Sequence, residues 1–148
     1  MISDFPRNYF YNGKLQDGDN VKGGDYVKPY HNLGPAFMPL VFWNLLSSRE
    51  KATISVSRMN VGEADLAVNL YLTLRNSCPS DSIAGKVGMI TPYSQQMEEL
   101  RRRFRHALGE RYEQEVEINT VDGFQGREKD IIIRMLILLL YLVEADRL

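Results

Sequence analysis

The sequence predicts an α/β fold with a mainly parallel sheet, and two observations carry this prediction. Candidate strands alternate with candidate helices along most of the chain, which is the order of a parallel sheet joined by crossover helices. The strand candidates, such as VGMI and DIII, are continuous apolar runs, as expected for strands covered on both sides. We therefore expect a three-layer fold with helices on both faces of the sheet.

Residues 1–36 predict a loop-rich N-terminal segment, because glycine and aspartate recur in it and prolines interrupt any regular element. The segment also carries an aromatic cluster made of Phe5, Tyr9, Phe10 and Tyr11. So much apolar surface needs a neighbour, so we expect this segment to dock on the rest of the domain.

The main domain is expected at 37–134. Its first strand is predicted at 39–46, from the run PLVFWNLL, and is followed by a polar and flexible stretch. Asn60 is then suited to cap a helix, since Glu63 follows three residues later, close to a capping box. Apolar residues at spacings of three and four mark one helix face up to about Asn76.

A second strand and helix follow. The strand is predicted at 87–90, with Thr91 as the N-cap of the next helix and Pro92 at its first position. Gly109 is a plausible C-cap. The buried stripe of this helix is expected to comprise Met97, Leu100, Phe104 and Leu108.

The arginines of this helix, at positions 101, 102, 103 and 105, have two interpretations. They could bind a nucleic-acid backbone, or they could form a solvated helix face. The second is favoured, because Glu98 and Arg102, and Glu99 and Arg103, stand at the i,i+4 spacing of ion pairs.

The last part of the chain predicts a strand at 115–119, a tight turn at 121–126, and a final strand from Asp130 to about Arg134. The apolar run from Ile131 to Val143 is too short for a membrane-spanning helix, which needs about 20 residues. Residues 135–148 are expected to form a divergent apolar tail.

Composition narrows the class of protein. The chain has 148 residues and a hydrophobic fraction of 44%, which fits one globular domain with a real core. With Cys78 as its single cysteine, it forms no internal disulfide or cysteine zinc cluster, which favours a reducing compartment. The net charge of -1 means that any polyanion must bind at a local site.

Chemistry is expected beyond the carboxyl ends of the strands, where open α/β sheets bind ligands. The richest segment there is 119–130, which reads NTVDGFQGREKD. Thr120 could cap a short turn whose free N–H groups receive a phosphate. Gly123 and Gly126 would let the backbone approach a ligand, and Glu128 could accept hydrogen bonds from sugar hydroxyls. A solvated loop of alternating charges is the alternative.

Four segments in order resemble superfamily 1 helicases of the senataxin and nonsense-decay type. The run VEINTVDGFQGREKDIII is similar to motif V of that family, and VGMITPYSQQMEELRRRF to the segment before it. ISDFPRNYFYNGKLQDGDNV resembles the stretch after motif IV, and VGEADLAVNLYLTL the helix that carries N-x-x-EA. Together these segments cover roughly 1–133.

The resemblance implies the second, C-terminal RecA-like domain, of the P-loop NTPase type, in an ATP-dependent RNA/DNA helicase. By motif position, Gly126 and Glu128 would line the nucleotide, with Glu128 near the ribose. Asp122 and Gln125 would couple the nucleotide site to the nucleic-acid site. The residues facing single-stranded RNA or DNA, or an RNA–DNA hybrid, would be Thr91, Pro92, Tyr93, Thr120 and Val121.

The departures from the family matter equally. The sequence contains no G-x-x-x-x-G-K-[ST] loop, no acidic pair for Mg²⁺ and no arginine in a motif VI context. We expect a domain that is incomplete at its C-terminus and cannot hydrolyse ATP alone, with ATP and Mg²⁺ held mainly by a first RecA-like domain. No metal site and no membrane partner is expected, and the location would be nuclear or, alternatively, cytoplasmic. A non-catalytic remnant that binds nucleic acid or protein is the alternative function.

Overall fold

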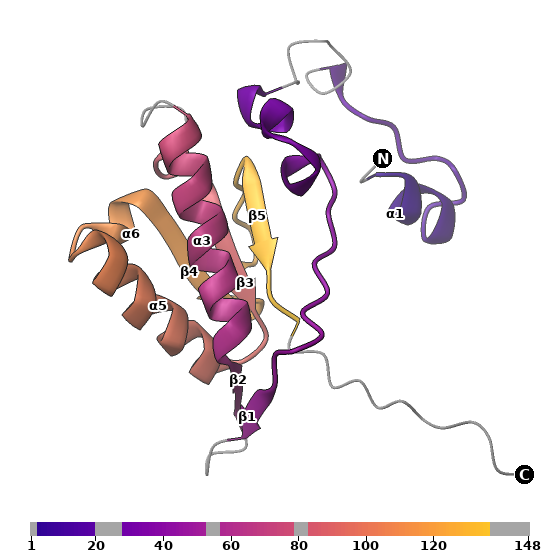
Figure 1. Ribbon diagram of the computed structural model, residues 1–148. Coiled ribbons are helices and arrows are strands. Elements are labelled where there is room, and N and C mark those ends of the chain that lie inside the picture. Colours follow the sequence, from indigo (N-terminus) through magenta and orange to yellow (C-terminus); the bar gives the residue numbers. More distant parts are fainter. Residues whose placement is uncertain (1–2, 20–27, 53–56, 79–82, 137–148) are drawn as a thin grey trace, which may run out of the picture. The chain divides into compact units, whose positions relative to one another are not determined.

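The computed structural model describes residues 3–19, 28–52, 57–78 and 83–136 of the chain (Figure 1). The chain divides into two compact units, Met1–Asn44 and Leu45–Leu148.

The N-terminal unit is loop-rich, as predicted, but contains short helical elements: α1 (Asp4–Tyr9), η2 (Pro29–Leu33) and η3 (Pro35–Phe37). Arg7 organises the loop after α1, because its guanidinium donates to the Leu15 carbonyl at 2.9 Å and to the Asp17 carboxylate at 2.5 Å. The rings of Phe5, Tyr9 and Phe10 contact one another.

The prediction of a strand at 39–46 is wrong. These residues have bends and irregular backbone. An apolar run makes a strand only where a neighbouring strand supplies backbone hydrogen-bond partners, and the sequence pattern does not report whether that neighbour exists.

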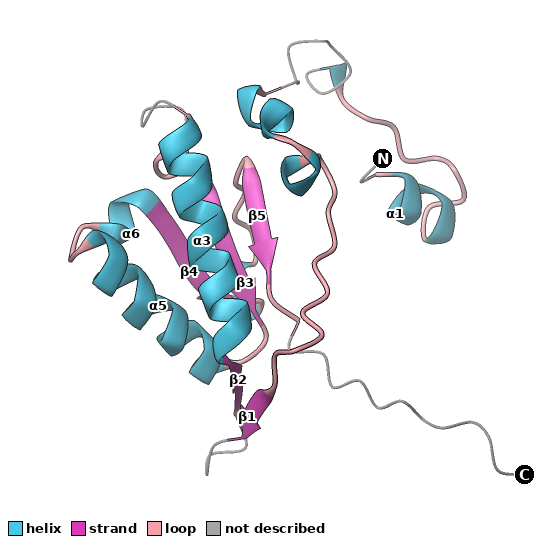
Figure 2. Cartoon of the chain, in the orientation of Figure 1, coloured by secondary structure: helices cyan, strands magenta, loops and turns pink. Residues whose placement is uncertain are grey.

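The larger unit contains a parallel three-stranded sheet, which confirms the predicted α/β class (Figure 2). Its strands are β3 (Val87–Thr91), β4 (Val116–Thr120) and β5 (Ile131–Arg134), in the order β4-β3-β5. Val87 of the central strand lies opposite both Val116 and Ile131, so the first residues of the three strands are in register. The predicted final strand and its end at Arg134 are confirmed.

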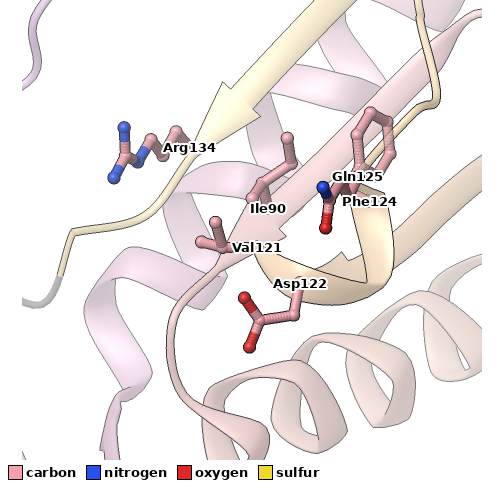
Figure 3. A pocket seen from close by; sticks show the side chains of 6 residues that line it. All are labelled: Ile90, Val121, Asp122, Phe124, Gln125 and Arg134. Carbon is pink, nitrogen blue, oxygen red and sulfur yellow. The ribbon is translucent and has the colours of Figure 1, made fainter.

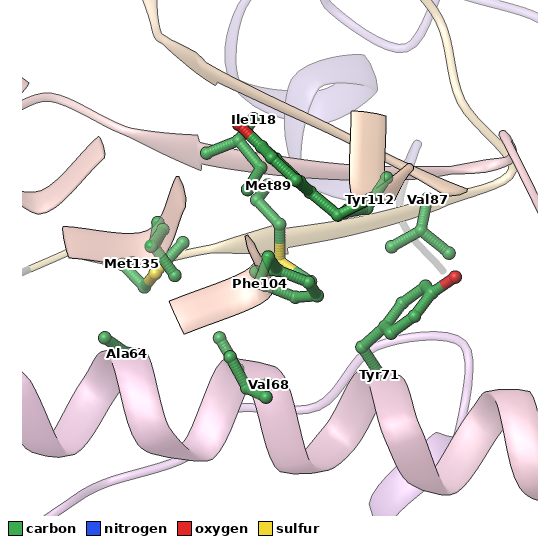
Figure 4. Packing of buried hydrophobic residues seen from close by; sticks show 12 residues of the cluster. Ala64, Val68, Tyr71, Val87, Met89, Phe104, Tyr112, Ile118 and Met135 are labelled. Atoms are coloured by element: carbon green, nitrogen blue, oxygen red, sulfur yellow. The ribbon is translucent and has the colours of Figure 1, made fainter. Parts of the chain in front are cut away.

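Two long helices, α3 (Val61–Ser77) and α5 (Ser94–Leu108), pack on one face of the sheet, and the short α6 (Tyr112–Glu115) leads into β4. Alternate strand residues point to this face, because side chains change sides at every residue of a strand. The resulting core is drawn in Figure 4 and includes Ala64, Val68, Tyr71, Val87, Met89, Leu100, Phe104, Val116 and Ile118.

The other face of the sheet is more open. Gly88 lacks a side chain there, and Phe124 fills the space: a Cβ at Gly88 would lie 2.7 Å from the Phe124 ring. Ile132 on the same face is 45% exposed. Across the described residues we find no third long helix on this side.

An antiparallel hairpin was missed by the sequence reasoning, which expected a flexible stretch before Asn60. Strands β1 (Glu50–Ala52) and β2 (Arg58–Asn60) pair, and the Arg58 guanidinium forms an ion pair with the Glu50 carboxylate. Strands of three residues are too short to show an alternating pattern.

The helix ends test the capping predictions. Asn60 caps α3 by accepting the Glu63 N–H at 3.2 Å, as predicted. Gly109 ends α5 with φ of 75°, and its N–H donates to the Arg105 carbonyl at 2.8 Å. Thr91 is not the cap of α5: it completes β3, and the helix begins only at Ser94.

The expected tail at 135–148 falls mostly outside the described residues. Met135 is described, is 4% exposed and belongs to the core cluster. The main domain therefore extends at least one residue beyond Arg134.

Candidate functional site

The carboxyl ends of all three parallel strands meet at one edge of the sheet. Thr91 at the end of β3 lies opposite Thr120 at the end of β4, and Ile90 lies opposite Arg134 at the end of β5. Ligands of open α/β sheets bind beyond this edge. The two segments predicted to carry binding residues, after β3 and after β4, begin at this edge.

The turn after β4 is fastened to both neighbouring strands. The Val121 N–H donates to the Thr91 carbonyl at 3.2 Å, and the Thr120 hydroxyl accepts the Gly123 N–H at 3.2 Å. The Asn119 amide donates to the Gly123 carbonyl at 3.1 Å. Thr120 thus holds the short helix η4 (Asp122–Phe124), in agreement with the predicted role as a turn cap.

Two expectations for this turn change. Besides Val121 and Gly123, the N–H groups of Phe124 and Gln125 donate to carbonyls within the turn, so these donors are not free to receive a phosphate. A Cβ at Gly123 would lie 2.3 Å from the Asn119 side-chain oxygen. The absence of a side chain at Gly123 therefore leaves room for the Asn119 side chain. We expect a ligand at this turn to be bound by side chains and not by these backbone N–H groups.

An open pocket of about 370 Å³ lies beside the turn (Figure 3). Three of the predicted residues, Val121, Asp122 and Gln125, line it. Its other lining residues are Ile90, from the predicted strand at 87–90, Phe124, from the predicted segment at 119–130, and Arg134, which sequence reasoning missed. The parallel register was the signal that could have found Arg134, because it places the end of β5 beside Ile90.

Of the three residues predicted to bind nucleic acid in the segment between β3 and α5, two are accessible at the surface. Thr91 is fully buried, and its hydroxyl accepts the Tyr93 N–H at 3.3 Å. Pro92 is exposed and Tyr93 is half-buried. Thr91 therefore stabilises the conformation of the segment from a buried position, while Pro92 and Tyr93 reach the surface.

A buried glutamine anchors the same segment to the start of α3. Gln96, which is fully buried, accepts the Asn60 N–H at 2.7 Å and donates to the Asn60 carbonyl at 3.1 Å. One residue earlier, the Gln95 N–H donates to the Ser57 hydroxyl at 3.2 Å. The first turn of α5 is therefore held by the residues around β2.

The predicted nucleotide residues lie after the turn. Gly126 has φ of 76°, a left-handed conformation that disfavours other residues, and nothing lies within 4 Å of where its Cβ would be. Glu128 is exposed, and its carboxylate has no hydrogen-bond or ion-pair partner among the described residues. Both are thus open to a ligand.

The cations on either side of Glu128 are fixed by one carboxylate of β4. Glu117 forms ion pairs with Arg127 and with Lys129, the second at 3.2 Å, and Lys129 also donates to the Gly85 carbonyl at 2.8 Å. Burial raises the pKa of Glu117, but the hydrogen bonds from Lys129 and Arg127 outweigh it and leave that pKa below its ordinary value. The charges flanking Glu128 are therefore structural.

The arginines of α5 are paired within the protein. Arg101 pairs with Glu98, Arg102 with Glu99, and Arg103 with both Glu99 and Asp65 of α3. The predicted Glu99–Arg103 pair is confirmed, whereas the predicted partner of Arg102 is wrong. These contacts support a solvated, internally neutralised helix face.

Two features of the described residues bear on possible partners. None of the described helices has both the length and the apolar character required to cross a bilayer. No group of three or more His, Cys, Asp and Glu side chains in the described ranges is arranged to hold a metal ion.

The comparisons with known proteins agree with this architecture. A family model described as "AAA domain" matches residues 1–137. The chain is 37% identical over 131 residues to Helicase sen1 of Schizosaccharomyces pombe, which covers 88% of this chain and 8% of that protein. It is 36% identical over 137 residues to Helicase SEN1 of Saccharomyces cerevisiae, covering 89% of this chain and 6% of the relative.

A third relative is a regulator of nonsense transcripts 1 homolog of Arabidopsis thaliana, 32% identical over 139 residues, with 89% of this chain and 10% of that protein covered. The chain thus spans a tenth or less of the length of these three relatives.

The parallel sheet, with its turns and pocket at the carboxyl edge, defines a RecA-like α/β domain. The chain belongs to the AAA-domain family, and within it to the superfamily 1 helicase domains of the senataxin and regulator-of-nonsense-transcripts type. The resemblance found in the four sequence segments is confirmed.

Proposed function

We propose that this chain works as the second, C-terminal RecA-like half of an ATP-dependent RNA/DNA helicase. The observation that supports this most is the hydrogen bond from the Val121 N–H to the Thr91 carbonyl. It joins the two segments that the family resemblance assigns to the nucleic acid. Relatives named as helicases cover most of the chain.

Single-stranded RNA or DNA, or one strand of an RNA–DNA hybrid, would lie along the carboxyl edge of the sheet. Pro92, Tyr93 and Val121 offer exposed or half-exposed surface to it. Thr91 and Thr120 act mainly by shaping the two segments, since their hydroxyls accept N–H groups of the protein.

ATP would contact the far side of the turn. Gly126 leaves open space for a phosphate or sugar, and the Glu128 carboxylate, which has no partner among the described residues, is suited to accept ribose hydroxyls. Asp122 and Gln125 stand in the η4 turn between the strand-facing and nucleotide-facing residues, so a shift of this turn would couple the two sites.

Hydrolysis needs groups that this chain does not supply. Its sequence lacks a phosphate-cradling loop and the arginine of motif VI. The described residues offer no ligand cluster for Mg²⁺. A first RecA-like domain of the same helicase would bring these parts. The working location would be the nucleus.

The test is to purify the chain and measure both ATP hydrolysis and binding of a fluorescent single-stranded RNA. We expect strand binding that weakens with salt, and no turnover above a buffer control. RNA-stimulated turnover would overturn the proposed division of labour. Absence of strand binding at every salt concentration would overturn the proposed nucleic-acid role.

A further inference from the structure

We propose that Arg134 is a strand-binding residue of this domain, which forms an ion pair with a phosphate of the bound single strand. The inference rests on the proposed function, because it takes the carboxyl edge of the sheet as the path of the strand. None of the residues assigned by the family resemblance supplies a positive charge at this edge.

The first support is position. Arg134 is the last residue of β5 and lies opposite Ile90, one residue before Thr91. It lines the pocket together with Val121, and Figure 3 shows the Arg134 side chain extending outward from the end of β5. The guanidinium therefore stands within the same edge as the residues assigned to the strand.

The second support is the absence of an internal partner. Among the described residues, the exposed Arg134 side chain makes no hydrogen bond, ion pair or ring contact. This contrasts with Arg101, Arg102 and Arg103 of α5, which are all paired with carboxylates. An unpaired guanidinium keeps its donors available for a phosphate oxygen.

The third support concerns the kind of ligand. The pocket also has an apolar floor of Ile90 and Phe124, and Val121 beside it is 43% exposed. A base or sugar can cover this apolar surface while its phosphate meets Arg134. Gly126 and Glu128, the residues proposed for ATP, do not line this pocket, which favours the strand over the nucleotide.

Asp122 also lines the pocket and would repel a phosphate placed next to it. Arg134 ends β5, whereas the η4 turn follows β4. The nucleic acid would therefore pass on the Arg134 side of the pocket, away from Asp122. Arg134 thus supplies the local charge that the near-neutral chain requires for a polyanion.

The experiment measures the affinity of the whole chain for a fluorescent single-stranded RNA at several salt concentrations. Each phosphate contact contributes about 0.7 to the magnitude of the slope of log affinity against log salt. We expect Arg134→Gln to lower that magnitude by about 0.7 and to weaken binding at low salt. The matched control is Arg111→Gln, since Arg111 is exposed, unpaired among the described residues and precedes α6 at the amino end of β4.

The outcomes separate this inference from the proposed function. If the unchanged chain does not bind RNA, the proposed function fails. If it binds, but Arg134→Gln and Arg111→Gln have equal slopes, the role of Arg134 is overturned. Competition by ATP that is lost in Arg134→Gln would instead assign the residue to the nucleotide and would also overturn the inference.

Discussion

The Gln96 side chain bonds to both backbone groups of a single residue, Asn60. Its oxygen accepts the Asn60 N–H at 2.7 Å, and its amide donates to the Asn60 carbonyl at 3.1 Å. The first turn of α5, which directly follows the segment that carries Pro92 and Tyr93, is thereby joined to the start of α3. A buried polar pair of this kind specifies one arrangement, because a shifted one would leave both groups unpaired.

We predict that Gln96→Leu destabilises the domain by about 2–6 kcal/mol, since two buried backbone groups lose their partner at about 1–3 kcal/mol each. Urea denaturation measures the loss. Gln95→Leu is the matched control, because the Gln95 side chain makes no hydrogen bond among the described residues. Equal losses in the two variants would show that the bridge to Asn60 has no special role.

Tyr71 is predicted to stabilise the contact between α3 and α6 through its hydroxyl. The Tyr71 hydroxyl donates to the Glu115 carboxylate at 2.6 Å, and Arg75 pairs with the same carboxylate. Tyr71→Phe should cost about 1.5–3 kcal/mol in the free energy of unfolding, the range for a bond to a charged group. Tyr112→Phe should cost less, because among the described residues the Tyr112 hydroxyl bonds only its exposed neighbour Glu113.

Because of the same tyrosine, we predict that the free energy of unfolding depends on pH in the alkaline range. Burial and then the hydrogen bond and charge of Glu115 raise the pKa of Tyr71 above its ordinary value of 10.0. Above about pH 10 the unfolded chain loses this proton while the folded one keeps it, so stability falls as pH rises. The fall should be smaller in Tyr71→Phe. An identical pH profile for the two proteins would contradict the assignment.

The two glycines of the turn should respond differently to alanine. Gly126→Ala meets no neighbouring atom and suffers only the left-handed backbone, at about 1–2 kcal/mol. Gly123→Ala must displace the Asn119 side chain and break its bond to the Gly123 carbonyl. We expect Gly123→Ala to weaken RNA binding and Gly126→Ala to weaken binding of a fluorescent ATP analogue. The reverse pattern would contradict the placement of the two ligands.

Glu117 is predicted to order the segment around Glu128 with little effect on global stability. Partly exposed ion pairs contribute less than about 1 kcal/mol, so Glu117→Gln should hardly move the urea midpoint. Hydrogen exchange at 127–131 should become faster in this variant, because Arg127 and Lys129 lose their shared carboxylate. Glu110→Gln, which removes the partner of Arg105 at the end of α5, is the control.

The lowered pKa of Glu117 gives that prediction a pH window. The stabilisation is complete above about pH 4.5, the ordinary value, and is lost as pH falls below it toward the lowered pKa. A loss of exchange protection on acidification, measured relative to the intrinsic exchange rate at each pH, should therefore appear in the unchanged chain and be absent from Glu117→Gln. If both proteins respond alike, another carboxylate orders the segment.

The sequence was informative where one local pattern decides the structure. Asn60 and Gly109 act as caps because capping depends on a few neighbouring residues. Strands β3 and β5 were found because apolar runs bounded by turn residues mark buried strands. The motif after β4 indicated its own importance through its composition and its family resemblance.

The rest depended on partners that are distant in sequence. Gln96 reads as one polar residue of an amphipathic helix until Asn60, 36 residues away, is placed beside it. Arg134 enters the pocket only through the register of β5 against β3. The run at 39–46 shows the converse, because apolar character without a strand partner gave irregular backbone.

The most direct test of the central claim is a titration of the isotopically labelled chain with single-stranded RNA, followed through its backbone amide NMR signals. We predict shifts concentrated at Tyr93, Thr120, Val121 and Arg134, with the signals of the amino-end residues Lys86 and Arg111 unchanged. Shifts spread over the α5 arginines instead, or no shifts at low salt, would contradict a strand path along the carboxyl edge of the sheet.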